Sequence, residues 1–98
     1  MKTQTLVELE RGTGQYGLPR ESAIVDDTEH GRLLIRQAFG GMGSLRGGAY
    51  RWGVACKVPA DATLASTAAL EMMDPAVVVL EHYDAEGVMR RLEREAAQ

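Results

Sequence analysis

Apolar and polar residues alternate between residues 49 and 58 in a way that predicts a β-strand. Every second position there is apolar: Tyr50, Trp52, Val54, Cys56 and Val58. Because successive side chains of a strand point to opposite faces of its sheet, these five are expected to share one apolar face. Cys56 is then a packed small hydrophobic residue rather than a nucleophile.

Three earlier segments predict further strands. Residues 5–10 form a short β-prone run that ends before a pair of glycines. Residues 22–26 and 32–39 flank residues 27–31, whose composition suits a hairpin loop, so this pair is expected to be antiparallel. A competing interpretation makes residues 29–39 a helix, because Leu34 and Ala38 would share a helical face.

The second half of the chain predicts a helix, a strand and another helix. Asp61 is expected to cap the first helix and Pro75 to end it. Its apolar face repeats every four residues, at Leu64, Ala68 and Met72. Residues 76–80 form a bare apolar run, typical of a strand buried on both faces, and the connection is long enough for a crossover to a parallel neighbour.

The final helix is predicted from its cap, its charges and its apolar face. Asp84 is expected to cap it, and Glu86 and Arg90 form a favourable i,i+4 pair. Its apolar side consists of Val88, Met89, Leu92 and Ala96. We therefore expect residues 1–98 to form a single α+β domain. Its architecture is a two-layer sandwich, with a mixed but mostly antiparallel sheet of about five strands and two helices in the order β-β-β-β-α-β-α.

A glycine-rich segment is the first candidate for chemistry. Five of the 11 glycines lie in residues 40–48. Backbone without Cβ atoms approaches a ligand closely, and successive N–H groups can hold an anion. Neither the dinucleotide fingerprint nor the P-loop pattern is complete after Gly41 or Gly43, and Ser44 lacks the flanking glycines of a nucleophile elbow. The alternative is a long hairpin connection with no ligand.

The charge distribution is the second candidate. Residues 30–60 hold five basic residues and no acid, whereas the whole chain has a net charge of −3. Arg32 and Arg36 would share one face of a strand, next to the glycine-rich segment. We expect an exposed basic surface there that binds an anion. The alternative is that these arginines pair with carboxylates such as Glu8 and Glu10 across the sheet.

These features lead to a functional hypothesis. The protein is expected to be a small non-enzymatic binding protein that takes an anionic, phosphorylated small molecule or an acidic protein partner. The expected ligand-binding residues are Gly41, Gly43, Ser44, Arg46, Arg51 and Arg36. No cofactor or metal site is expected, since the chain has only two histidines and one cysteine. Nucleic acid is a less favoured partner, because the chain is net negative.

Two alternatives remain open. One is a protein–protein adaptor or homo-oligomeric accessory protein of bacterial or phage origin, with a homodimer as its simplest form. The other is a small enzyme that uses His82 as a general base and Asp84 to orient it. The single cysteine, the lack of a signal peptide and the absence of an apolar run of membrane-spanning length lead us to expect a cytoplasmic protein.

Overall fold

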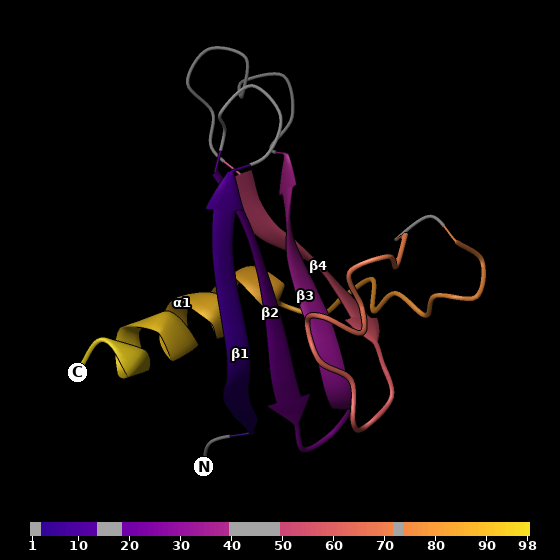
Figure 1. Cartoon of the computed structure of the whole chain (residues 1–98). Helices are drawn as coiled ribbons and strands as arrows, with labels where there is room; N and C mark the ends of the chain where they lie inside the picture. The colour runs from indigo at the N-terminus through magenta and orange to yellow at the C-terminus, as the bar shows by residue number, and fades with distance from the viewer. Residues whose placement is uncertain (1–2, 14–18, 40–49, 72–73) are drawn as a thin grey trace.

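The computed structural model describes residues 3–13, 19–39, 50–71 and 74–98. These form four strands and one helix (Figure 1): β1 (Gln4–Thr13), β2 (Pro19–Asp27), β3 (Gly31–Phe39), β4 (Tyr50–Lys57) and α1 (Ala85–Ala96). The class is α+β as expected, but with four strands instead of about five and one helix instead of two. In these ranges no helix is long and apolar enough to span a membrane.

The sheet is an antiparallel meander in the order β1-β2-β3-β4. The predicted hairpin is confirmed, and the competing helix over residues 29–39 is wrong, because β3 pairs with β2 from Gly31 to Arg36. The turn depends on two residues. Asp27 Oδ1 accepts hydrogen bonds from the backbone N–H groups of Glu29 and His30, and Gly31 takes a φ of 80°, which favours glycine.

A β-bulge in β4 changes which side chains share a face. Arg36 pairs with Val54 and Gln37 with Trp52, so Gly53 has no partner on β3. The extra residue shifts the alternation by one position. Trp52 and Cys56 consequently belong to the cores on opposite faces of the sheet, and the prediction that they share one face is wrong.

A second bulge lies in β1, the other edge strand. Leu6 pairs with Val25 and Glu8 with Ile24, which leaves Val7 unpaired and 40% exposed. As a result Leu6 and Leu9, three positions apart, both pack on the core beneath α1. Bulges of this kind twist an edge strand and make it a poorer template for pairing with other chains.

One face of the sheet, the helix face, is covered by α1. Its core combines six sheet residues with three from the helix: Ala23, Val25, Leu33, Ile35, Trp52 and Ala55 with Ala85, Met89 and Leu92. The predicted cap is confirmed, since the Asp84 side chain accepts from the Gly87 N–H. The predicted Glu86–Arg90 pair is also present, at 2.9 Å. Ala96, expected on the apolar side, is exposed.

The opposite face, the loop face, is covered by side chains of residues 58–71 and by Val77. In Figure 1 the chain that directly follows β4 passes in front of the sheet. Here the small core of Ile24, Leu34 and Cys56 is covered by Val58, Leu64, Leu70 and Val77. The expected arrangement, with helices on one face of a two-layer sandwich, is therefore wrong. The sheet lies between one helix and one irregular segment.

Side chains of the sheet explain why the predicted helix after Asp61 does not form. Thr63 and Ser66 exchange hydrogen bonds as in a helix cap, and the Thr67 N–H bonds to the Thr63 carbonyl. The next bonds are of the tighter i→i+3 kind, and Arg36 donates to the carbonyl oxygens of Thr67 and Leu70. Tertiary hydrogen bonds thus stabilise turns where the sequence predicts a helix. Met72, on the predicted apolar face, lies outside the described residues.

Residues 76–80 are not a buried strand. They pass along the edge of β4 with one antiparallel bridge, between Cys56 and Val79, so the expected parallel neighbour is also wrong. Val77 packs on the loop face and Leu80 on the helix face, whereas Val78 is 55% and Val79 37% exposed. The apolar run therefore joins two cores across a sheet edge instead of filling the middle of a sheet.

Candidate functional site

The structure describes only some of the predicted site residues. Gly41, Gly43, Ser44 and Arg46 lie outside the described residues, and only the backbone of Arg51 is described, in β4. Arg36, His82 and Asp84 are fully described. The anion site can therefore be built upward only from Arg36.

Arg36 holds the irregular segment against the sheet. Its Nη1 donates to the Leu70 carbonyl at 2.6 Å and its Nη2 to the Thr67 carbonyl at 2.9 Å. A segment without regular structure can cover a sheet only if its backbone polar groups find partners, and Arg36 supplies two of them. The guanidinium is consequently fixed in place before any ligand arrives.

Arg32 has a similar structural role but a neutralised charge. Its guanidinium donates to both carboxylate oxygens of Asp26, at 2.8 and 3.0 Å, and to the Ala62 carbonyl. The pair lowers the pKa of Asp26, mainly through these hydrogen bonds. Arg32 and Arg36 share the loop face, as predicted, but both are only partly exposed beneath residues 58–71. In the described part of the chain they do not form the expected open basic surface.

A pocket of about 350 Å³ opens beside Arg36 on the loop face. Ser22 lies directly opposite Arg36 in the β2–β3 register, and Thr67 and Leu64 form the wall contributed by the irregular segment. Glu10 of β1 also lines the pocket. The volume falls in the range of small-molecule sites.

The two charged residues of this pocket, Arg36 and Glu10, lie in different environments. Within the described residues, Arg36 makes hydrogen bonds only to neutral carbonyls and forms no ion pair. Glu10 is exposed to solvent, which weakens but does not remove the effect of its charge on the pocket, whereas Arg36 is partly buried. Arg36 therefore supplies a positive charge that no carboxylate of the described chain neutralises.

Sequence reasoning missed Ser22, Thr67 and Glu10 as pocket residues. The predicted hairpin contained the signal for Ser22, because a turn that pairs Asp27 with Gly31 also pairs Ser22 with Arg36. The sequence contained no such signal for Thr67, because its position depends on the irregular segment.

Cys56 packs beside Leu34, one of the residues that line this pocket. It is fully buried, as predicted, and burial raises the pKa of its thiol, an effect that the nearby Arg36 charge only partly offsets. A buried thiol with a raised pKa is a poor nucleophile.

The catalytic alternative, His82 with Asp84, lies in a different place. Both residues line a wider groove of about 620 Å³ on the helix-face side, near the β2–β3 turn. Asp84 uses its carboxylate to cap α1, and His82 is exposed without a described partner. The two residues share a groove but no hydrogen bond, so this geometry does not favour a general-base pair.

Beside His82, a buried carboxylate organises the groove. Asp27 is 5% exposed and accepts hydrogen bonds from the Tyr83 hydroxyl at 2.7 Å and from Gln4 Nε2 at 3.1 Å, besides the two turn N–H groups. Burial alone would raise the pKa of Asp27, but these hydrogen bonds outweigh it and lower the pKa below its ordinary value. Burial, reinforced by Asp27, raises the pKa of Tyr83. Asp27 therefore stays ionised and Tyr83 stays protonated.

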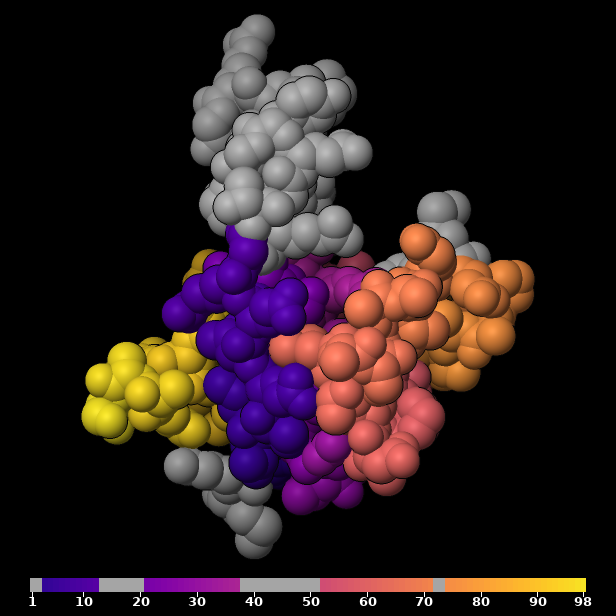
Figure 2. All heavy atoms as spheres, in the orientation of Figure 1, coloured from indigo at the N-terminus to yellow at the C-terminus, as the bar shows by residue number. Residues whose placement is uncertain are grey.

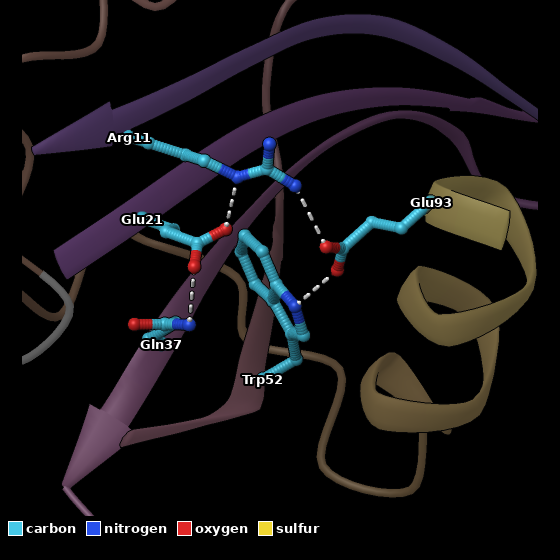
Figure 3. A network of polar contacts seen from close by, with 5 residues as sticks. All are labelled: Arg11, Glu21, Gln37, Trp52 and Glu93. Atoms are coloured by element: carbon cyan, nitrogen blue, oxygen red, sulfur yellow. Dashed lines mark hydrogen bonds and ion pairs between the residues drawn. The ribbon is translucent and has the colours of Figure 1, made fainter. Parts of the chain in front are cut away.

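A polar network joins α1 to the far end of the helix face (Figure 3). Glu93 accepts from Trp52 Nε1 at 2.7 Å and from Arg11 at 3.0 Å, and Arg11 also pairs with Glu21. Gln37 donates to the same Glu21. The acceptor for the indole N–H comes from the helix, so the network fixes α1 relative to the sheet.

Removal of the Glu93 acceptor tests this role. Glu93→Ala leaves the buried Trp52 N–H unpaired and is expected to cost about 1–2 kcal/mol of unfolding free energy, measured by urea titration. Because Trp52 is the only tryptophan, its fluorescence should shift as well. Arg11→Ala, which removes a largely exposed partner, should lower the unfolding free energy by less than Glu93→Ala does. Equal losses in the two variants would contradict the role of the indole bond.

No family model, no curated protein and no solved structure matches the chain. The roles of its residues therefore rest on geometry and chemistry alone. Among the described residues, no three histidine, cysteine or carboxylate side chains gather into a group that could hold a metal ion.

Proposed function

We propose that this protein is a small non-enzymatic binding protein that takes an anionic small molecule at the Arg36 pocket. The observation that carries the proposal is the charge of Arg36, which is held rigidly by two backbone carbonyls and is not neutralised by a carboxylate of the described chain. Preorganised guanidinium groups bind phosphate and carboxylate well, because no ordering cost remains at the moment of binding.

The other pocket residues indicate the kind of ligand. Ser22 offers a hydroxyl opposite Arg36, and Glu10 offers an acceptor at the rim. A ligand that combines a phosphate or carboxylate with a hydroxyl or amine would satisfy both ends of the pocket. The glycine-rich residues Gly41, Gly43 and Ser44, with Arg46 and Arg51, remain proposed contributors, since the glycine-rich segment begins four positions after Arg36.

Titration with inorganic phosphate, followed by amide chemical shifts, tests the proposal. We expect shifts to concentrate at Ser22, Arg36 and Thr67, and Glu10→Gln to tighten binding roughly two- to fivefold, because it removes a nearby negative charge. Arg36→Gln should abolish binding, whereas Arg94→Gln, which removes an equal charge from an exposed helix position, should not.

Two results would overturn the proposal. One is a set of shifts that avoids the pocket, and the other is phosphate affinity that responds equally to Arg36→Gln and Arg94→Gln. Should Arg36→Gln fail to fold, Glu10→Gln still decides the question, because its expected effect has the opposite sign and needs no buried contact to be broken.

A further inference from the structure

The groove beside Tyr83 has features that the Arg36 pocket lacks. It shares no lining residue with that pocket and lies at the β2–β3 turn, the opposite end of the sheet from the strand ends that residues 40–49 connect (Figure 1). Its walls combine apolar side chains, two histidines and several carboxylates. A binding event here would therefore be independent of the anion site.

Carboxylates dominate the charge of the groove lining, and the nearby Arg91 donates to Gln4, one of the lining residues. Four carboxylates line it, from Asp27, Glu29, Glu81 and Asp84, and no lysine or arginine of the described chain does. Asp27 is held ionised by neutral donors only, and within the described residues it forms no ion pair. A cationic group entering the groove would meet fixed negative charge without displacing an internal cation.

The apolar part of the groove lies along the chain that borders β4. Val79, Leu80 and Val88 line the groove, and Val78 and Val79 are the most exposed large hydrophobic residues of this edge. In Figure 2 the orange residues that precede α1 form the mass that projects to the right of the sheet. An occupant that carries both apolar and cationic side chains matches such a surface better than a bare cation does.

The backbone at Val79 is oriented for one more strand. The Lys57 N–H donates to the Val78 carbonyl and the Leu80 N–H to the Ala55 carbonyl, so Cys56 and Val79 form a non-hydrogen-bonded antiparallel pair. In such a pair the N–H and C=O of Val79 point away from β4. No partner for them exists among the described residues.

From these observations we propose that the groove binds an extended peptide segment of alternating basic and apolar residues, which adds as a strand along Val79. Main-chain hydrogen bonds to Val79 would supply affinity, and the carboxylates of Glu29 and Glu81 would select lysine or arginine side chains. The edge strand β1 is a poorer site for such an addition, because its bulge at Val7 interrupts the ladder.

Fluorescence anisotropy with a labelled seven-residue peptide of alternating lysine and valine tests the proposal on the full chain. We expect this peptide to bind and the matching glutamate–valine peptide not to bind. Glu29→Gln combined with Glu81→Gln should weaken binding by about threefold or more, because two attractive charges are lost. Glu71→Gln, an exposed carboxylate outside the groove, should leave binding unchanged.

A second peptide tests the strand addition. The lysine–valine peptide with a methyl group on every backbone nitrogen keeps its charge and apolar side chains but has no N–H donor on either strand edge, so it should not bind. Equal affinity of the methylated and unmethylated peptides would overturn the proposal, as would equal affinity of the lysine and glutamate peptides. The proposal would also be overturned if the lysine–valine peptide bound the Glu29→Gln/Glu81→Gln double variant and Glu71→Gln with the same affinity.

Discussion

Asp27→Ala is expected to lower the free energy of unfolding by about 3–5 kcal/mol, as measured by urea denaturation. The wild-type carboxylate accepts four hydrogen bonds, from Tyr83, Gln4 and the backbone N–H groups of Glu29 and His30. It is 5% exposed, so its removal leaves these donors without an acceptor where little water can replace it. The side chain also shapes the β2–β3 turn.

Two variants separate the parts of this effect. Tyr83→Phe removes one charged hydrogen bond and should cost about 1.5–3 kcal/mol. Asp74→Ala is the matched control, because Asp74 also accepts a backbone N–H in a turn but is exposed, and it should cost less than about 1 kcal/mol. A loss at Asp27 no larger than the loss at Asp74 would show that burial of the carboxylate contributes nothing.

The pH dependence of stability gives a second measure of Asp27. Its pKa in the folded protein lies below the ordinary value of 3.8, so the unfolded chain binds a proton first as the pH falls. The stabilisation by Asp27 is therefore fully present above that ordinary value and is lost as the pH falls through the lower folded pKa. In Asp27→Ala the decline of stability in this acidic range should be shallower than in the wild type.

Met89→Ala is expected to cost about 2–5 kcal/mol, because it opens a cavity in the core between α1 and the sheet. Met89 is fully buried and, with Leu92, carries the contact of α1 with the strands. In a domain whose total stability is of the order of 5–15 kcal/mol, such a loss brings α1 close to detachment. Urea denaturation followed by Trp52 fluorescence measures both the loss and the exposure of the helix face.

Met89→Leu is the volume-conserving control and should cost less than about 1.5 kcal/mol. Val88→Ala, at a half-buried position of the same helix turn, should lower the free energy of unfolding by less than Met89→Ala does. If Met89→Ala cost no more than Val88→Ala, the helix could not be packed on the sheet as described.

The local sequence pattern is sufficient to predict the β2–β3 hairpin and the final helix, α1. Asp27 and Gly31 have the chemistry of a tight turn, and Asp84 with the Glu86–Arg90 pair has the chemistry of a helix start. Both depend on contacts between residues close in sequence, which is why the sequence alone predicts them. The strand β4 was likewise predicted, although the faces of its side chains were not.

The errors arose where distant residues decide the outcome. The bulge at Gly53 moved Trp52 and Cys56 to opposite faces, and periodicity cannot detect one extra residue in a pairing that is not yet known. The predicted helix after Asp61 does not form, because Arg36 donates hydrogen bonds to carbonyl groups of that segment. Arg36 is more than 30 positions away in the sequence from these carbonyls.

For the candidate site, the sequence determined that Arg36 is a basic residue on a predicted strand. The observed β2–β3 register then placed Ser22 opposite it. Only the tertiary structure decided that Arg32 is neutralised by Asp26, while Arg36 lines a pocket and forms no ion pair with the described residues. It also decided that the apolar run ending at Leu80 lies along an edge and borders an acidic groove. The physical reason is the same in both cases. Charge compensation and burial depend on which groups come into contact in the folded protein, and local sequence patterns do not specify those contacts.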